Sequence, residues 1–273
     1  LDAESLEAIQ KTIKVFAAAH PDYKWIRGRG WYYSPFPGGL PTRQQLDELV
    51  PDRPAYMACY DGHTAWANTL ALKLAGITRD TPDPKDGIIV KDPKTGEPTG
   101  VLKDEAMGPV FAIMPEPSEE QVDAALARAM RFTASRGVTA VASVSAGWNQ
   151  VAGLLRARRN GALSVRVSLY PPLADWRRVA DSVRASGPGD DWIRLAGVKG
   201  FVDGSLGSTT ALFFEPYADD PTTSGLLTTP EDSLRNQIGR ADSAGLQVVV
   251  HAIGEKANAL VLDIYDSVAK THG

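Results

Sequence analysis

The second part of the chain alternates short apolar runs with helix-like stretches in a regular order. A capping box at Ser118-Glu119-Glu120-Gln121 opens the first helix. Strands are predicted at 138–143, 164–170, 192–202 and 246–251, and helices at 118–136, 148–160, 175–185, 230–244 and 255–269. This order is typical of βαβ units, which build a parallel sheet. The predicted fold class is therefore α/β, and four such units make about half of an eight-stranded barrel.

The first 117 residues follow a less regular pattern. Apolar residues at helical spacing predict a helix over about 3–19, and 25–31 is typical of a short strand. The region that follows is rich in Pro, Gly and Asp and holds short pieces at 55–59, 65–75 (helix-like) and 87–90. We interpret the chain as three parts: the start of a barrel region at 1–33, an inserted lid or substrate subdomain at 34–117, and barrel βα units at 118–273.

Composition limits the classes of partner. The net charge is −4 with Lys and Arg scattered, so neither nucleic acid nor an anionic membrane is an expected partner. No apolar run approaches the roughly 18 residues of a membrane helix. Cys59 is the only cysteine, which excludes an intrachain disulfide and a cluster of thiolate metal ligands. We therefore expect a small-molecule substrate.

Lys199 stands inside an apolar run, 195–202, that is too short and valine-rich for a typical helix. Burial lowers the pKa of a lysine because it disfavours the ammonium form. A neutral amine can form a Schiff base, or add carbon dioxide to give a carbamate whose oxygens bind metal. The alternative is a lysine whose head reaches solvent at the strand's rim, against which the apolar neighbours argue.

His251 closes another apolar run, 246–251, and stands before a loop. An imidazole at this place can ligate a divalent metal, or it can be a hydrogen-bonded core histidine. The carboxyl ends of parallel barrel strands meet at one rim, which is where such folds build active sites. We therefore predict that Lys199 and His251 converge at that rim.

Three further residues are candidates for substrate contacts. Asp203 follows the lysine strand in a glycine-rich turn, where it can orient a ligand or simply form the turn. His63 lies in a loop before a helix-like piece and can hydrogen-bond a substrate, or be an ordinary polar loop residue. Trp31 belongs to an aromatic group that can line a pocket or be plain core.

Four stretches together resemble the amidohydrolase superfamily, specifically the amidohydrolase family 3 group that includes N-substituted formamide deformylases. They are WIRGRGW at 25–31, DGHTAWANTLAL at 61–72, VKGFVDGSLGSTTALFFEPYADD at 198–220 and LQVVVHAIGEKAN at 246–258. The intervening TPDPKDG and EPTGVLKDEA fit the same pattern, so the likeness spans essentially the whole chain. Each motif is weak singly, whereas the combination in this order is specific.

The resemblance implies a distorted (β/α)₈ TIM-like barrel, a small β-sandwich built from both termini, and one or two divalent ions, with zinc as the expected metal. Lys199 matches a lysine that is carboxylated in many members, His251 matches a histidine ligand, and His63 matches a histidine thought to face the substrate. The implied reaction is hydrolysis of an amide or related carbon–nitrogen bond, not a peptide bond, by a metal-activated water.

The chain departs from the family pattern at both ends. The family's His-x-His pair is expected upstream of Leu1, and its sixth-strand histidine and its catalytic aspartate, the general acid and base, downstream of residue 273. We therefore expect an internal fragment without the terminal β-sandwich and last strands, which is inactive alone. Its open sheet edges predict self-association into a homo-oligomer.

Two other interpretations stay open. The chain can be a non-catalytic truncated product or one half of a split assembly, which the missing ligands favour. Alternatively, Lys199 can serve as the Schiff-base lysine of a barrel enzyme that needs no metal.

Overall fold

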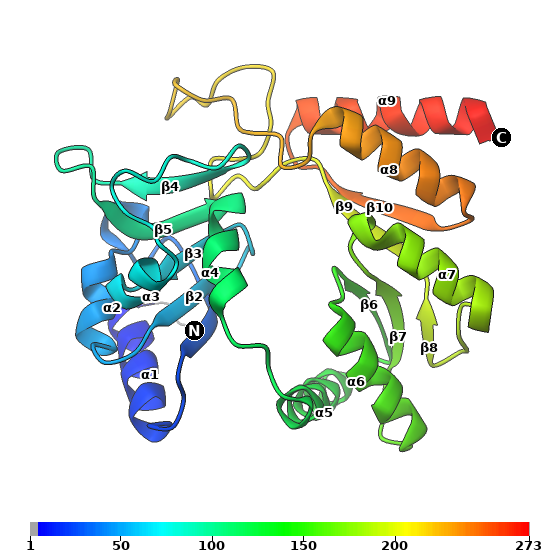
Figure 1. The fold of residues 1–273 in the computed structure, drawn as a ribbon, viewed down its shortest axis with the longest axis horizontal. Coiled ribbons are helices and arrows are strands. Elements are labelled where there is room, and N and C mark those ends of the chain that lie inside the picture. The colour runs from blue at the N-terminus through cyan, green and yellow to red at the C-terminus, as the bar shows by residue number, and fades with distance from the viewer. Residues whose placement is uncertain (1–4, 273) are drawn as a thin grey trace. The chain divides into compact units, whose positions relative to one another are not determined.

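A computed structural model describes residues 5–272 and shows a mixed α/β fold. The chain divides into two compact units. The first comprises residues up to Pro115 together with Asp203–Thr228, and the second comprises Glu116–Val202 together with the residues from Thr229 onward. Figure 1 labels their elements.

Unit 1 is built on a five-stranded sheet with the order β1-β2-β3-β5-β4. The first pair is parallel and the other pairs are antiparallel. The strands are β1 (Ile26–Trp31), β2 (Ala55–Cys59), β3 (Thr64–Ala67), β4 (Gly87–Lys91) and β5 (Pro98–Asp104). Because β2, β3 and β5 are buried along nearly their whole length, they form the centre of the unit.

Helices and two apolar cores cover this sheet. The helical segments are α1 (Leu6–Ala19), η1 (Pro37–Gly39), α2 (Arg43–Leu49), α3 (Thr69–Leu74), η2 (Glu105–Met107) and α4 (Gly108–Ile113). Alternate residues of β2 enter different cores: Met57 packs with Ile9 and Ile13 of α1, whereas Tyr56 packs with Leu102 and Val110. This alternation is the expected two-residue period of a strand covered on both faces.

The segment 203–228 has no helix or long strand, yet it belongs to unit 1. Asp203 and Leu227 form an isolated antiparallel bridge. The Lys103 ammonium of β5 donates to the carbonyl of Ser208, and Gly225 N–H bonds the Thr223 hydroxyl. The Lys103 bond thus holds this long loop against the sheet, whereas the other two contacts lie within the loop itself.

In the described part of unit 2, the strand ladders are all parallel. The sheets are β6-β7-β8 and β10-β9, and Pro172 and Lys199 form a parallel bridge between them. The strands are β6 (Ala140–Val144), β7 (Arg166–Tyr170), β8 (Ile193–Leu195), β9 (Gly197–Phe201) and β10 (Gln247–His251). Figure 1 shows helices alternating with these strands along the chain.

The helical segments of unit 2 are α5 (Glu119–Ser135), α6 (Trp148–Arg159), η3 (Leu173–Asp175), α7 (Trp176–Ser186), α8 (Glu231–Ser243) and α9 (Glu255–His272). The capping box predicted at the start of α5 is confirmed: Ser118 accepts from Gln121 N–H, and the Gln121 side chain accepts from Ser118 N–H. Met130 and Leu154 pack with Leu169 in the core between α5, α6 and β7. No described helix has the length and apolar character needed to cross a membrane.

The prediction of a helix-like piece at 65–75 is wrong in its first part. Thr64–Ala67 is the strand β3, which pairs with β2 and β5, and only Thr69–Leu74 is helical. Asn68 separates the two, because its side chain accepts from Ala71 N–H and caps the helix. Long-range pairing therefore decides a segment whose local pattern favours helix.

The single strand predicted at 192–202 is two strands. β8 pairs with β7, whereas β9 pairs with β10, and the chain leaves the first ladder at Ala196. The Ala196 N–H still bonds the carbonyl of Leu169 in β7. β10 is only partly buried, and among the described strands it pairs with β9 alone.

Strand pairing crosses residue 33, where the sequence predicts a domain boundary, and the three-part division stays a prediction. β1 lies before that boundary and β2 after it, yet the two pair in one sheet. In addition, 203–228, predicted as part of the barrel segment, contacts unit 1. The two compact units follow strand pairing rather than the change in composition at residue 34.

Asp190, between α7 and β8, offers a test of how the start of β8 is held. Its carboxylate accepts from the N–H groups of Ile193 (2.9 Å) and Trp192 (2.8 Å) and from Arg158. These hydrogen bonds lower the pKa of Asp190 from 3.8 to about 2. The folded state therefore holds this proton less tightly than the unfolded state, so the stabilisation is present above pH ~4 and is lost as the pH falls towards ~2.

We expect Asp190→Asn to lower the urea midpoint of unfolding at pH 7, and the difference from wild type to shrink as the pH falls below ~4. Asp191→Asn, at the adjacent exposed position, is the control and should change the midpoint little. A difference in urea midpoint between wild type and Asp190→Asn that stays constant from pH 7 to pH 3 would contradict this account of Asp190.

Candidate functional site

Lys199 lies in the middle of β9, where the strand is almost fully covered. The residue is 9% exposed, and its backbone N–H donates to the carbonyl of Pro171 over 2.8 Å. Its Nζ lies over the ring of Phe201, 4.2 Å from the centroid. Burial lowers the pKa of the Lys199 amine to about 8, because the ammonium form loses hydration. Burial therefore favours the neutral amine, which can act as a nucleophile or a ligand.

His251 ends β10 on the strand directly beside Lys199. In the parallel register Val249 is opposite Lys199, and His251 is opposite Phe201. Side chains of residues opposite each other, or two apart on one strand, share a face. The His251 ring lies 5.3 Å from the ring of Phe201. The structure thus brings the amine and the imidazole to one face of β9–β10, with contacts to the same aromatic ring.

The donor chemistry of this pair fits a divalent metal. A neutral lysine nitrogen, or carbamate oxygens formed from it, and an imidazole nitrogen are suitable donors for zinc. Within residues 5–272 no group of three or more His, Cys, Asp and Glu side chains could hold a metal. Zinc needs at least three protein ligands in its catalytic sites. Lys199 and His251 therefore fit as part of a ligand set and do not complete one.

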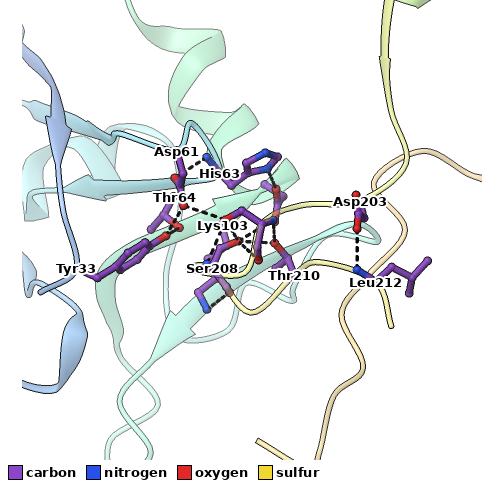
Figure 2. A network of polar contacts seen from close by, with 11 residues as sticks. Tyr33, Asp61, His63, Thr64, Lys103, Asp203, Ser208, Thr210 and Leu212 are labelled. Atoms are coloured by element: carbon purple, nitrogen blue, oxygen red, sulfur yellow. Dashed lines mark hydrogen bonds and ion pairs between the residues drawn. The ribbon is translucent and has the colours of Figure 1, made fainter. Parts of the chain in front are cut away.

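His63 lies in unit 1, in the turn between β2 and β3. Its backbone N–H donates to Asp61 Oδ1 over 2.9 Å, and its ring Nδ1 lies 2.7 Å from Asp104 Oδ1 at the end of β5. The His63 side chain is 11% exposed and that of Asp104 is 4% exposed. Figure 2 shows the imidazole among the polar side chains of this network. The structure therefore gives His63 a buried carboxylate partner.

Asp61 connects the same turn to β1 and to the 203–228 loop. Its Oδ2 accepts from the Tyr33 hydroxyl over 2.8 Å and from the Ser205 hydroxyl over 2.9 Å. Tyr33 also bonds the Thr64 hydroxyl at 2.7 Å, and burial raises the pKa of Tyr33 well above its ordinary value. Tyr33 is consequently a neutral donor, and Asp61 acts as an acceptor that fixes the turn.

Lys103 precedes Asp104 on β5 and anchors the loop from the other side. Its ammonium donates to the carbonyl of Ser208, whose hydroxyl bonds that of Thr210 (Figure 2). Burial lowers the pKa of Lys103, while the carboxylates around it, Asp104 first, act in the opposite direction. The loop is therefore held by hydroxyl and ammonium contacts at the rim of the sheet.

Asp203 and Trp31, which were candidates for substrate contacts, both lie in the interior of unit 1. The Asp203 carboxylate is fully buried, and its Oδ2 accepts from Leu212 N–H over 2.8 Å (Figure 2). Trp31 is fully buried as well, and its indole N–H donates to the carbonyl of Met57 over 2.8 Å. Asp203 thus fixes the loop, and Trp31 packs in the core beside Tyr33. The structure gives these two residues structural contacts, and their substrate roles stay predictions.

The sequence places Tyr33 in the same aromatic group as Trp31, which can line a pocket, and it does not single out Lys103, Asp104 or Ser205 as site residues. A usable signal exists for Asp104, which closes the apolar strand Val101-Leu102-Lys103-Asp104 in the same way as His251 closes its own. The contacts of the other three carry no local signal, because their partners are 28 to 144 residues away in sequence.

Comparisons with known proteins agree on one family. The chain is 40% identical over 260 residues to the protein LONG AFTER FAR-RED 3 of Arabidopsis thaliana, covering 91% of this chain and 44% of that protein. It is 35% identical to the putative amidohydrolase YtcJ of Bacillus subtilis, covering 95% and 49%. The N-substituted formamide deformylase of Arthrobacter pascens is 25% identical, with 97% and 51% covered. The chain thus spans about half the length of these relatives.

The structure resembles that of an uncharacterized metal-dependent hydrolase from Pyrococcus horikoshii, with a TM-score of 0.66 and 30% identity. The match covers 97% of this chain and 51% of that one. The model of the amidohydrolase family, named Amidohydro_3, matches residues 1–273 without interruption. The chain therefore belongs to the amidohydrolase family.

Proposed function

We propose that the full-length protein is a divalent-metal-dependent hydrolase of amides or related carbon–nitrogen bonds, other than peptide bonds. The observation that carries this proposal is the pairing of Lys199 and His251 on one face of β9–β10. Family membership supports hydrolysis, and the metal-dependent hydrolase of similar structure supports the metal.

Lys199 is proposed as a ligand after reaction with carbon dioxide. The lone pair of the neutral amine attacks the carbon of CO₂, a nitrogen–carbon bond forms, and the nitrogen releases one proton to solvent. With a pKa of about 8, roughly one amine in ten is neutral at pH 7. The ring of Phe201 covers the nitrogen and restricts its orientation. The product carries two carboxylate oxygens, which can bridge two ions.

His251 is proposed as a second ligand through a ring nitrogen, with zinc as the metal. When bound, such an ion supplies Lewis-acid activation of water and of the scissile carbonyl. Two ligands do not fill a zinc coordination shell. We therefore propose that the remaining ligands and the general acid and base lie outside residues 5–272, and that this chain alone is inactive.

Substrate recognition is assigned to unit 1 within this proposal. His63 is proposed to contact the substrate, with the region 34–117 acting as a lid or substrate subdomain. The similarity to an N-substituted formamide deformylase supports a small amide with a substituent on nitrogen as the substrate class. A concrete probe is 4-nitroformanilide, whose hydrolysis releases the coloured 4-nitroaniline.

The first test concerns the metal ligands. Lys199→Ala and His251→Ala in the full-length protein should each lower bound zinc, measured by mass spectrometry of the metal, and should lower hydrolysis at least about 100-fold. This size is expected because changes that only orient metal ligands already cost about 10- to 100-fold. Incubation with ¹³C-bicarbonate should produce a carbamate signal in wild type that Lys199→Ala lacks.

The matched controls are Lys256→Ala, at an exposed position of α9, and His20→Ala, in unit 1. Both should keep wild-type metal content. Full metal content in both the Lys199 and the His251 variants would refute the assignment of this pair as ligands.

The second test concerns the reaction class. The full-length protein should hydrolyse 4-nitroformanilide, lose this activity to a chelator and regain it on addition of zinc, whereas a peptide 4-nitroanilide should remain intact. The free 273-residue chain should hydrolyse neither 4-nitroformanilide nor the peptide 4-nitroanilide. Hydrolysis that is insensitive to chelation would exclude the metal mechanism.

A second candidate function draws on the same lysine. The lowered pKa of Lys199 also suits Schiff-base formation with a carbonyl substrate. Borohydride would then trap the substrate on Lys199 in the metal-free protein. The presence of His251 beside Phe201 favours the metal assignment, because a Schiff-base lysine needs no such partner.

A further inference from the structure

We propose that Asp104 is a positioning residue that fixes the imidazole of His63 in one tautomer and one orientation, ready to form a hydrogen bond with the substrate. The reaction in which His63 takes part rests on the proposed function. The pairing itself is a separate claim about unit 1, and it can be tested without any substrate.

The geometry of the pair defines the tautomer. His63 Nδ1 lies 2.7 Å from Asp104 Oδ1, a short distance typical of a charge-assisted hydrogen bond. An ionised carboxylate only accepts hydrogen bonds, so the shared proton belongs to Nδ1. In the neutral ring Nε2 then carries the lone pair and can accept a proton.

Because Asp104 is buried, its carboxylate depends on the hydrogen bond with His63. The side chain is 4% exposed, and its second oxygen, Oδ2, has no hydrogen-bond partner among the described residues. A buried carboxylate that has lost water depends on the partners it keeps. Since His63 is its ring partner at Oδ1, the carboxylate holds the imidazole strongly in place.

The backbone joins the same two residues a second time. Asp104 N–H donates to the carbonyl of His63 over 3.0 Å. Asp104 has φ 47° and ψ −123°, a conformation that residues with a side chain rarely adopt. Such backbone geometry persists where the surroundings enforce it, and it concentrates at functional sites.

The 203–228 loop covers the carboxylate closely. A Cβ on Gly204 would lie 3.0 Å from Asp104 Oδ2 and 1.9 Å from the Thr210 hydroxyl oxygen. Only a residue without a side chain allows this approach. The loop therefore keeps water from the carboxylate, which strengthens its bond to His63.

Nuclear magnetic resonance of the ¹⁵N-histidine-labelled full-length protein tests the pairing directly. At a pH where the ring is neutral, wild-type His63 should be the Nδ1–H tautomer, with the signal assigned by its loss in His63→Gln. Asp104→Asn should reduce or invert this preference, because an amide can also donate to Nδ1. Asp47→Asn, which removes a carboxylate bound to Thr69 in the same unit, is the control and should leave the tautomer unchanged.

Kinetics with 4-nitroformanilide test the consequence. Asp104→Asn should lower kcat about 10-fold or more, with KM within about 2-fold, because loss of one preorganised hydrogen bond to the transition state costs about 10²- to 10³-fold. In a His63→Gln background the same change should have no further effect, because Asp104 acts through His63.

The outcomes separate the two claims. An Nε2–H tautomer in wild type, or an Nδ1–H tautomer that survives in Asp104→Asn, would overturn the positioning role whatever the activity. If none of the variants folds, the tautomer of His63 in the wild-type spectrum decides whether Asp104 pairs with it as proposed.

Asp104→Gly relieves the backbone and removes the carboxylate, so normal kcat in that variant would show a purely structural role and overturn the proposal. Absence of any formanilide hydrolysis would count against the proposed function, while the spectra still decide the pairing.

Discussion

The parallel register between β9 and β10 is the constraint on which the candidate metal site depends. It sets Lys199 opposite Val249 and His251 opposite Phe201, so that one face carries an amine, an aromatic ring and an imidazole. A shift of one residue would turn either side chain to the other face. The bridge from Pro172 to Lys199 fixes the strand from its other side. Backbone pairing thus produces the unusual chemistry of the lysine.

Unit 1 uses a half-buried carboxylate, Asp61, and a buried one, Asp104, in a comparable way. Asp61 gathers the hydroxyls of Tyr33 and Ser205, and Asp104 holds His63. Each of the two carboxylates joins segments that are distant in sequence, and each loses hydration in doing so. A carboxylate removed from water is stable only with directed partners. The same hydrogen bonds that hold the loop therefore also orient the histidine.

Much of the secondary structure of unit 2 could be predicted, because its helices carry their own signals, such as the capping box at Ser118. The prediction failed where distant pairing decided the outcome, as at Ala196, where one apolar run divides between two ladders. The strand Thr64–Ala67 lies in a helix-like sequence and exists because β2 and β5 flank it. Local pattern carries no information about such neighbours.

The amino-acid sequence alone determined the family, the strand that carries Lys199 and the strand that ends at His251, because motifs and hydrophobic runs are local properties. Tertiary structure alone decided that 203–228 joins unit 1, that Trp31 packs in the core, and that Asp104 faces His63. The physical reason is that burial and hydrogen bonding depend on which segments meet in space. A carboxylate gains its role only when another part of the chain removes its water and supplies its partner.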